Sequence, residues 1–171
     1  MKEIKIEDIK LNPFTKISDE WMILAAGTKE NGYNAMTCSW GHMGAIWQSG
    51  GGLPSVVVYV RPSRYTKEFV DREEFFTVSF FDKKYKKDMA YIGTHSGRDE
   101  DKIAKVGFTP VFTDESTYFE EADMVFICRK LYQAPIKEEG FVRQETVDEC
   151  YPKRDFHEMY IGEIVKALVK E

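Results

Sequence analysis

The sequence predicts a mainly β protein, an antiparallel barrel with a few short helices inserted between its strands. Two observations carry this prediction. Residues 54–60 (PSVVVYV) and 75–81 (FFTVSFF) are short apolar runs rich in β-branched and aromatic residues, a composition that favours strands. Several strands also follow one another through hairpins rather than helical crossovers, and Asn31-Gly32 is a typical hairpin turn.

The chain has 171 residues, enough for one hydrophobic core, and we expect a single domain over residues 1–171. The predicted strands, in chain order, are 21–28, 34–40, 54–60, 75–81, 122–136 and 157–170. The predicted helices are 63–72, 83–93 and 97–107, of which the last two end at a glycine suited to a C-terminal cap. Residues 12–20 are interpreted as a turn and lead-in, and the SGGG segment 49–52 as a mobile loop.

Composition excludes several function classes. The net charge is −5, from 24 basic and 29 acidic residues, which argues against general nucleic-acid binding. The N-terminus has mixed charge, and no apolar run approaches the roughly 18 residues that span a membrane, so we expect a cytoplasmic protein. The three cysteines are widely separated, which predicts reduced thiols. Histidine and cysteine lack ligand spacing, and no metal site is expected.

The segment Asn34–Trp47 (NAMTCSWGHMGAIW) combines small residues with bulky ones and contains no Val or Leu. In a strand, side chains alternate between the two faces. One face then carries Met36, Cys38 and Trp40 and suits a core, whereas the other carries Ala35, Thr37 and Ser39 and is nearly flat. A planar ligand could lie against the flat face; alternatively, another strand or a helix packs closely there.

The segment RPSRYT, residues 61–66, has the chemistry of a phosphate site. Ser63 is a suitable N-cap for the predicted helix 63–72, Arg61 and Arg64 flank it, and Tyr65 and Thr66 add hydroxyls. Guanidinium groups and unpaired N–H groups are typical partners of a phosphate monoester. The alternative is a capped surface helix with two solvated arginines.

A second segment of this kind is HSGRDEDK, residues 95–102. Ser96 and Asp99 predict a capping box at the start of a helix. Arg98 and Lys102 are four residues apart and share one helical face. Cations at a helix N-terminus are unfavourable unless an anion lies nearby, which again suggests a phosphate. Alternatively, Asp99 offsets part of this cost and no ligand is needed.

Together these segments predict a planar ligand that is polar along one edge and carries a phosphate on a tether. FMN fits this description better than a simple sugar phosphate, which needs no flat wall. NAD is less natural as the resident ligand because no G-x-G-x-x-G follows a first strand.

Five segments, taken in order, resemble the flavin reductase-like family of FMN-binding split-barrel proteins, which includes flavoredoxins. The segments are NAMTCSWG, VYVRPSRYTKEFV, FTVSFF, SGRDEDK and FHEMYIGEIV, and the likeness runs from about Trp21 to about Val165. The resemblance implies a six-stranded antiparallel Greek-key split β-barrel. It also implies a homodimer that holds FMN non-covalently near the subunit interface.

The resemblance also implies roles for residues of this chain. Backbone groups of Met36, Thr37, Cys38 and Ser39 would line the isoalloxazine. From the aromatic content of the chain we also expect Trp40 or Trp47 to shield one face of the flavin. The phosphate and ribityl side would be held by Arg61, Ser63, Arg64, Tyr65, Thr66, Ser96, Gly97, Arg98 and Lys102. His157 would lie on a strand near the flavin. The segment 48–54 is longer than in relatives and could gate the site or be a surface elaboration.

In an FMN protein the cofactor carries the hydride or electron chemistry, and the chain supplies position and electrostatics. No Ser-His-Asp set or carboxylate pair is evident, so we expect no essential protein acid or base. The leading hypothesis is an oxidoreductase reduced by NAD(P)H or a redox protein. The alternatives are an electron carrier without nicotinamide turnover and a flavin-binding protein without catalysis.

Overall fold

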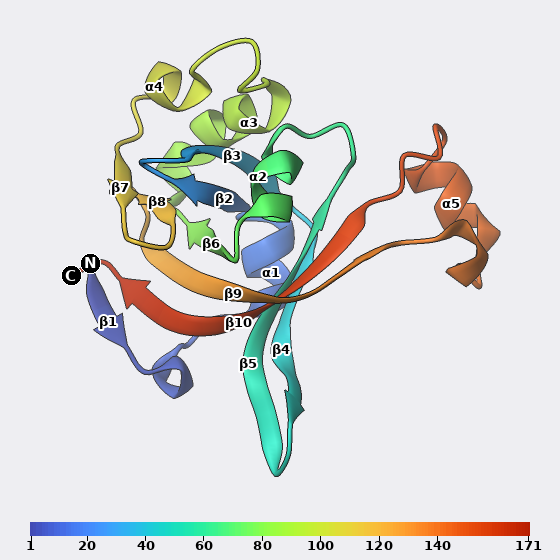
Figure 1. The fold of residues 1–171 in the computed structure, drawn as a ribbon, viewed down its shortest axis with the longest axis horizontal. Coiled ribbons are helices and arrows are strands. Elements are labelled where there is room, and N and C mark those ends of the chain that lie inside the picture. The colour runs from blue at the N-terminus through green and yellow to red at the C-terminus, as the bar shows by residue number, and fades with distance from the viewer.

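The computed structural model describes residues 1–171 and is dominated by an antiparallel sheet (Figure 1). The strands are β1 Lys2–Ile4, β2 Met22–Thr28, β3 Gly32–Cys38, β4 Gly41–Gln48, β5 Gly51–Val60, β6 Phe75–Phe80, β7 Pro110–Phe112, β8 Thr117–Phe119, β9 Met124–Pro135 and β10 Glu158–Val169. The α-helices are α1 Pro13–Ser18, α2 Thr66–Arg72, α3 Lys86–Thr94, α4 Lys102–Val106 and α5 Gln144–Cys150. Three short 3₁₀ turns are Ile6–Asp8, Lys83–Tyr85 and Glu138–Gly140.

The main sheet has eight strands in the order β3-β2-β6-β9-β10-β5-β4, with β1 pairing with β10, and every pairing in it is antiparallel. β3 and β4 end the order and do not pair with each other, so the barrel is split between them. The predicted split-barrel class is confirmed. All six predicted strands are present; β1 and β4 join them in the main sheet, and β7 and β8 form a separate pair.

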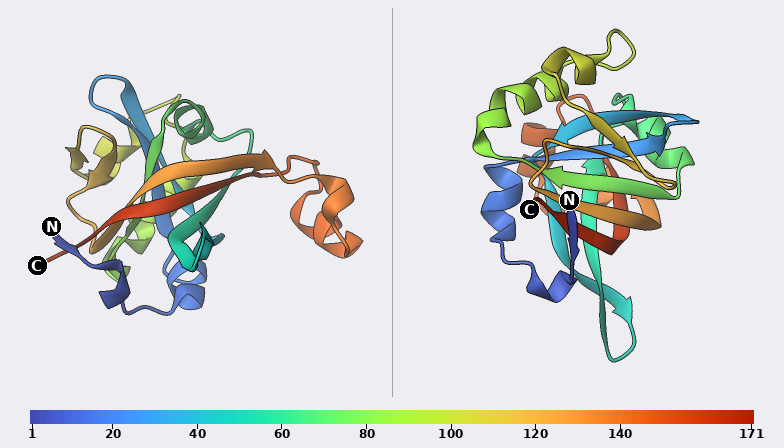
Figure 2. Two further views of the ribbon diagram at one scale, coloured as in Figure 1. Left: turned by 60° about the horizontal axis from the view of Figure 1, so that its bottom comes forward. Right: turned by 90° about the vertical axis from the view of Figure 1, so that its left-hand side faces the viewer.

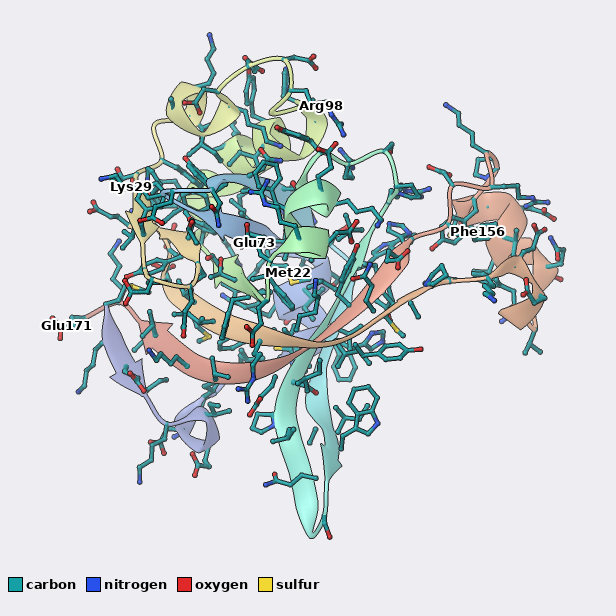
Figure 3. All side chains as sticks on the ribbon, viewed as in Figure 1. Met22, Lys29, Glu73, Arg98, Phe156 and Glu171 are labelled. Atoms are coloured by element: carbon teal, nitrogen blue, oxygen red, sulfur yellow. The ribbon has the colours of Figure 1, made fainter.

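Two hydrophobic clusters lie on the two faces of the sheet. The first has 19 buried residues, among them Met22, Leu24 and Phe80, and fills the barrel. The second has 12 buried residues, among them Ile23 and Ile92, and packs α3 and α4 onto the outer face. Alternate residues of β2 enter opposite clusters, so β2 is apolar on both sides. Figure 3 shows Met22 near the centre of the molecule and Arg98 at the top of the view, near α3 and α4.

Two predictions about helix starts are wrong: the lead-in turn at residues 12–20 and the N-terminus of the helix 63–72. Residues 12–20 are not a lead-in turn, because Asn12 caps α1 and its Oδ1 accepts a hydrogen bond from the Phe14 N–H at 3.1 Å. Pro13 occupies the first helical turn, where its missing N–H is not needed. The predicted helix 63–72 begins only at Thr66, and its N-cap, Tyr65, makes no side-chain capping bond.

The predicted helix 97–107 is also shorter than expected. Asp101, not Ser96, caps α4, and its Oδ1 accepts from the Ala104 N–H at 3.0 Å. The Ser96–Asp99 capping box is therefore wrong; the Ser96 hydroxyl accepts instead from the Arg98 N–H at 3.2 Å. The glycine cap is confirmed at Gly107, which has a φ of 74°, whereas α3 passes through Gly93 and ends at Thr94.

The glycine-rich segment 49–52 is not a mobile loop, and this prediction is wrong. β4 and β5 pair from Gly41↔Val58 to Gln48↔Gly51, which leaves only Ser49 and Gly50 in the turn. A Cβ on Gly52 would lie 2.6 Å from the Ala45 Cβ, so glycine permits the close approach of the two strands. Figure 1 shows this hairpin as a ribbon that projects from the barrel.

A second projection is residues 136–156, which leave β9, form α5 and return to β10. The Ile136 N–H donates to the His157 carbonyl at 2.9 Å and closes the base of this excursion. Figure 2 shows the excursion reaching away from the barrel and the two termini lying together at the opposite end, where Lys2 pairs with Val169. The longest helix, α3, has nine residues, and none is long and apolar enough to cross a membrane.

Candidate functional site

A pocket of about 220 Å³ lies where the ends of β3, β5 and β10 meet. Nine residues line it: Met36, Thr37, Cys38, Ser39, Trp40, Tyr59, Arg61, Arg64 and His157. Five of them come from the segment NAMTCSW and two from RPSRYT, so the fold brings these two sequence motifs together.

The strand β3 offers its backbone edge rather than a flat face. Met36 and Cys38 point into the barrel core, whereas Ala35 is buried in the cluster beneath α3. The Thr37 hydroxyl donates to the Met89 carbonyl of α3 at 2.5 Å, and a Cβ on Gly93 would lie 3.2 Å from the Thr37 Cβ. The flat face of Ala35 and Thr37 thus packs against α3, which is the second of the two interpretations that the sequence left open. Thr37 and Ser39 nevertheless line the pocket.

The edge of β3 remains available to a ligand. β3 is the last strand of the sheet on its side, so alternate backbone N–H and C=O groups along it have no strand partner. Ser39 and Trp40, just beyond the strand, are exposed. This segment can therefore donate backbone hydrogen bonds to the polar edge of a planar molecule.

Arg61 lines the pocket, but its guanidinium is already engaged. It forms a 2.7 Å ion pair with Asp155, donates to the Cys150 carbonyl at 2.9 Å, and lies 5.1 Å from the centre of the Tyr151 ring. Burial acts to raise the pKa of Asp155, yet the hydrogen bond and charge of Arg61 outweigh it and hold that pKa below its ordinary value. Arg61 thus fastens the excursion 136–156 to the barrel.

Arg64 is the more available cation. It is exposed, lines the pocket, and makes one hydrogen bond, from Nη1 to the Gly93 carbonyl at 2.8 Å. Lys102 differs from it: the side chain is buried, and its ammonium donates to the Ile92 and His95 carbonyls at 2.8 and 2.9 Å. Burial, followed by the charge of Arg64, lowers the pKa of Lys102 to about 8. Lys102 thereby satisfies the carbonyls at the C-terminal end of α3.

Arg98 and the residues around it lie beside the pocket rather than in its lining. The Arg98 guanidinium lies 4.6 Å from the centre of the Tyr65 ring, donates to the Ser63 carbonyl at 3.4 Å and pairs with Glu68. Tyr65 lines a neighbouring polar pocket of about 420 Å³, together with Gly97 and Lys102. The predicted phosphate residues therefore do not share one pocket. Arg61 and Arg64 line the first pocket and Tyr65, Gly97 and Lys102 the second, whereas Ser63, Thr66, Ser96 and Arg98 line neither.

A buried hydrogen bond between side chains connects β3 with the start of α2. The Asn34 side chain donates to the Thr66 hydroxyl at 2.8 Å, and both residues are buried. A Cβ on Gly97 would lie 2.2 Å from Asn34 Oδ1, so only glycine allows the loop to approach this closely. Thr66 and Gly97 thus hold β3, α2 and the loop before α4 in place, while Ser96 is half-buried in that loop.

His157 contributes an uncharged imidazole to the pocket. It is 9% exposed, and its Nδ1 shares a 2.8 Å hydrogen bond with the Tyr151 hydroxyl. Its ring centre lies 5.1 Å from that of Trp40. Burial, and then the charge of Arg61, lower the pKa of His157 to about 4, so the ring is neutral near pH 7.

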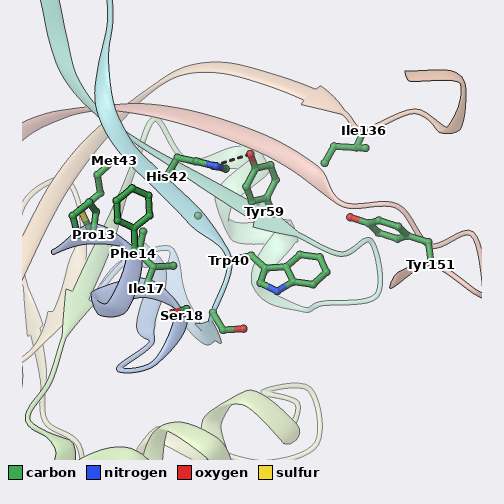
Figure 4. Close-up of a pocket in the computed structure, with 12 residues that line it drawn as sticks. Pro13, Phe14, Ile17, Ser18, Trp40, His42, Met43, Tyr59, Ile136 and Tyr151 are labelled. Atoms are coloured by element: carbon green, nitrogen blue, oxygen red, sulfur yellow. Dashed lines mark hydrogen bonds between the residues drawn. The ribbon is translucent and has the colours of Figure 1, made fainter. Parts of the chain in front are cut away.

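A larger groove adjoins the pocket and has a volume of about 590 Å³ (Figure 4). The pocket and the groove share Ser39, Trp40 and Tyr59. Sequence reasoning missed Tyr59 and Tyr151. Tyr59 could have been found, because it lies two residues before Arg61 on a predicted strand and so shares its face; Tyr151 left no such signal.

A split barrel with an unpaired strand edge, a nearby exposed arginine and an adjoining groove defines a class, the flavin-binding split-barrel proteins. The chain belongs to the flavin reductase-like family, since the model of the flavin reductase like domain matches residues 14–171. It is thus a flavin-binding redox protein. No curated protein is significantly similar to it in sequence.

Solved structures with the same fold include two flavoredoxins. That of Desulfovibrio vulgaris (Miyazaki F) is 24% identical with a TM-score of 0.65, over 88% of this chain and 69% of that one. That of Methanosarcina acetivorans is 22% identical with a TM-score of 0.64, over 100% and 77%. An FMN-binding domain of a flavin reductase-like enzyme from Shewanella baltica OS155 is 12% identical with a TM-score of 0.65, over 97% and 75%. These identities support the shared fold alone.

Proposed function

We propose that residues 1–171 form a single FMN-dependent oxidoreductase domain that receives electrons from NAD(P)H or a redox protein and passes them to a small acceptor. The observation that carries this proposal is the pocket itself, in which the free edge of β3 and the exposed Arg64 lie together. The donor set fits FMN: backbone N–H groups suit the polar edge of the ring, and a guanidinium suits the phosphate.

In this proposal the chain binds and orients the cofactor, and bound FMN supplies the hydride or electron transfer. Backbone groups from Met36 to Ser39 hold the ring edge, with Trp40 beside it. Cys38 takes no part as a nucleophile, because burial raises the pKa of its thiol to about 12. The neutral imidazole of His157 closes the pocket without adding charge.

For the phosphate side, we assign direct contact to Arg64, with Arg61, Ser63 and Arg98 beside it. The remaining residues support the segments that carry these groups, and they are Tyr65, Thr66, Ser96, Gly97 and Lys102. We base this assignment on whether each side chain already has hydrogen-bond partners within the chain. Lys102, for example, already donates to two carbonyls.

One observation favours the alternative of an electron carrier without nicotinamide turnover. The groove beside the pocket is lined by no Lys or Arg that could pair with the pyrophosphate of a nicotinamide dinucleotide. A redox-protein donor needs no such pairing. A flavin-binding protein without catalysis would differ from both in that no donor reduces its flavin.

We also propose that the protein is a homodimer in the cytoplasm. Exposed apolar side chains gather where the β4–β5 hairpin meets β9: Trp47 is 55%, Leu131 38% and Tyr132 44% exposed, and the rings of Trp47 and Tyr132 lie 5.8 Å apart. Such a group of side chains is suited to a subunit contact. The three free thiols suit a reducing compartment.

The test begins with an absorbance spectrum of the purified protein, in which bound FMN gives a band near about 450 nm. Anaerobic stopped-flow mixing with NADH and with NADPH then measures bleaching of that band. Rapid bleaching supports the nicotinamide-dependent oxidoreductase. A band that bleaches only with a reduced redox protein supports the carrier, and protein that binds no flavin after incubation with FMN rules out both.

A further inference from the structure

The pocket and the adjoining groove contain two tyrosine–histidine pairs. The Tyr59 hydroxyl lies 3.1 Å from His42 Nδ1, and the two rings meet edge to face with their centres 5.9 Å apart (Figure 4). The Tyr151 hydroxyl lies 2.8 Å from His157 Nδ1. Each pair joins a hydroxyl to an imidazole, which is an arrangement through which a proton can pass.

The two pairs differ in their contact with water. Tyr151 and His157 are buried, at 3% and 9% exposure, and burial lowers the pKa of His157 to about 4. His42 is exposed and Tyr59 is half-buried. Imidazoles ordinarily take up and release protons between about pH 5 and 8. Only the Tyr59–His42 pair can therefore draw protons from water near neutral pH.

Tyr59 stands where the two cavities join. It lines both the pocket proposed for the flavin and the groove beside it, and only Ser39 and Trp40 share that position. Burial raises the pKa of Tyr59, so its hydroxyl keeps its proton at neutral pH. This hydroxyl can therefore donate to a molecule in the groove while a flavin occupies the pocket.

No other side chain of the two cavities is suited to the same task. Neither lining contains Asp or Glu, and the two arginines of the pocket do not release protons. Burial raises the pKa of the Cys38 thiol to about 12. The charged side chains on neighbouring elements are engaged with partners, namely Lys16 with Glu20, Arg61 with Asp155 and Glu158 with Gln133.

We propose that Tyr59 is the proton donor of this site and that His42 returns a proton to it from water. The inference rests on the proposed function, in which reduced FMN supplies a hydride to an acceptor in the groove. The Tyr59 O–H bond breaks as a bond to hydrogen forms on the acceptor, beside the atom that receives the hydride. The protonated His42 ring passes its Nδ1 proton to the Tyr59 oxygen and is left neutral, with its remaining proton on Nε2. The acceptor thus gains two electrons and two hydrogens, and water supplies the proton that His42 takes up.

The first test uses two acceptors that differ in their need for a proton. FMN-loaded protein is reduced with dithionite in the absence of oxygen and mixed by stopped flow with ferricyanide, which takes electrons alone, or with diamide, whose N=N bond takes a hydride and a proton. Tyr59→Phe should slow the diamide reaction by at least about a hundredfold, the usual size of general acid catalysis, and the ferricyanide reaction by less than about twofold. Equal slowing of both reactions, or an unchanged diamide reaction, would overturn the proposal.

Tyr118→Phe is the matched control. Tyr118 is also half-buried, lies on β8, and lines none of the cavities around the site. Neither rate should change in this variant. A diamide reaction slowed as much as in Tyr59→Phe would contradict the assignment of the proton to Tyr59.

His42→Gln tests the supply of protons to Tyr59. A glutamine amide can donate a hydrogen bond to the tyrosine oxygen but takes up no proton. In the unchanged protein the diamide rate should fall as the pH rises from about 5.5 to about 8, because less of the imidazole is protonated. In His42→Gln the rate should be low and independent of pH in this range. A variant whose rate still falls with the same midpoint would refute the role of His42.

The hydrogen bond itself is measured on flavin-free protein. In ¹H–¹⁵N NMR spectra at about pH 5.5, both ring nitrogens of a protonated histidine carry hydrogen, and the bond to Tyr59 should slow exchange of the His42 Nδ1 proton with water. The signal of this proton should be visible in the unchanged protein and in Tyr118→Phe, and absent in Tyr59→Phe. A signal that persists in Tyr59→Phe would overturn the pairing.

Failure of this inference and failure of the proposed function give different results. Protein that shows no flavin band after incubation with FMN would refute the proposed function and the proton donor with it. Protein that binds FMN, and in which Tyr59→Phe slows diamide and ferricyanide equally, would refute the proton donor alone.

Discussion

Two arginines from one sequence motif have different environments. The guanidinium of Arg61 pairs with Asp155 and donates to the Cys150 carbonyl, whereas that of Arg64 donates a single hydrogen bond, to the Gly93 carbonyl. Both were expected at the phosphate, and spacing alone does not distinguish them. The distinction arises from the excursion 136–156, which reaches Arg61 but not Arg64.

Arg64→Ala tests the phosphate contact. FMN binding should weaken by about 1.5–3 kcal/mol, the size of a charge-assisted hydrogen bond, while riboflavin, which has no phosphate, should be nearly unaffected. Fluorescence titration with both ligands gives the comparison. Arg129→Ala is the control, because Arg129 pairs with Glu163 and lines none of the pockets around the site. Equal losses for FMN and riboflavin would show that Arg64 does not contact phosphate.

Arg61→Ala tests the fastening of the excursion. Loss of the Asp155 ion pair and the Cys150 hydrogen bond should speed amide hydrogen exchange in residues 144–156 by about tenfold or more. Mass spectrometry of exchanged peptides measures this. Arg64→Ala should leave the same peptides unchanged, and an effect of equal size in both variants would contradict the assignment.

The lowered pKa of His157 predicts how the free energy of unfolding depends on pH. Its pKa of about 4 in the folded protein lies below the ordinary value of 6.5, so the unfolded chain binds more protons between these limits. The contribution of His157 to the free energy of unfolding is fully present above about pH 6.5. It is lost as the pH falls toward 4, by up to about 3 kcal/mol. NMR titration of the imidazole should give a midpoint near 4. A midpoint near 6.5 would refute the buried neutral state.

At the scale of elements, the close approach between β3, α2 and the loop before α4 depends on Gly97. In Gly97→Ala the new Cβ would meet Asn34 Oδ1 at 2.2 Å and displace Asn34 from its bond with Thr66. We expect a loss of about 1–3 kcal/mol in the free energy of unfolding, measured with urea. Gly44→Ala is the control, because no atom lies within 4 Å of its added Cβ. Equal stabilities of the two variants would contradict this packing.

Sequence patterns predicted the buried strands well and the exposed ones poorly. β2, β5 and β6 are buried and leave apolar runs in the sequence. β4 pairs on one side only and is largely exposed, so its residues follow no hydrophobic pattern and it was not predicted. The glycines of the β4–β5 hairpin were mistaken for a loop because they act through backbone approach, which has no side-chain signature.

Helix starts were predicted less well because several residues can serve as caps. Ser63 and Ser96 match a capping pattern, but Tyr65 and Asp101 occupy the cap positions. Serine and aspartate also stabilise turns, and Ser96 does so through the Arg98 N–H. Local chemistry therefore located the polar segments correctly but not the residue at which each helix begins.

At the scale of the whole molecule, the fold assembles the site from distant parts of the chain. The motifs NAMTCSW and RPSRYT were predicted to meet, and they line one pocket. Tyr151 is brought to the site by its contact with Arg61, which lies 90 residues earlier in the chain. No local sequence pattern predicts such a contact. The groove is likewise assembled from distant parts of the chain: α1, the β3–β4 connection, the start of β4, β5 and the excursion 136–156.

The arrangement of the whole barrel explains why the site lies where it does. The sheet is split between β3 and β4, and an open strand edge next to a pocket occurs only where a barrel is not closed. The pocket beside β3 and the groove beneath α1 both use residues next to this opening. In the proposed site, the split is what leaves backbone groups of β3 available to a planar cofactor.

The central claim is that FMN lies with its ring along the edge of β3 and its phosphate at Arg64. Amide and guanidinium NMR spectra of ¹⁵N-labelled protein, recorded with FMN and with riboflavin, test it most directly. We expect both ligands to shift the amide signals of Thr37, Cys38 and Ser39, and only FMN to shift the Arg64 side-chain signal. Shifts confined to the polar pocket around Tyr33 and Tyr65, with the β3 amides unchanged, would contradict the claim.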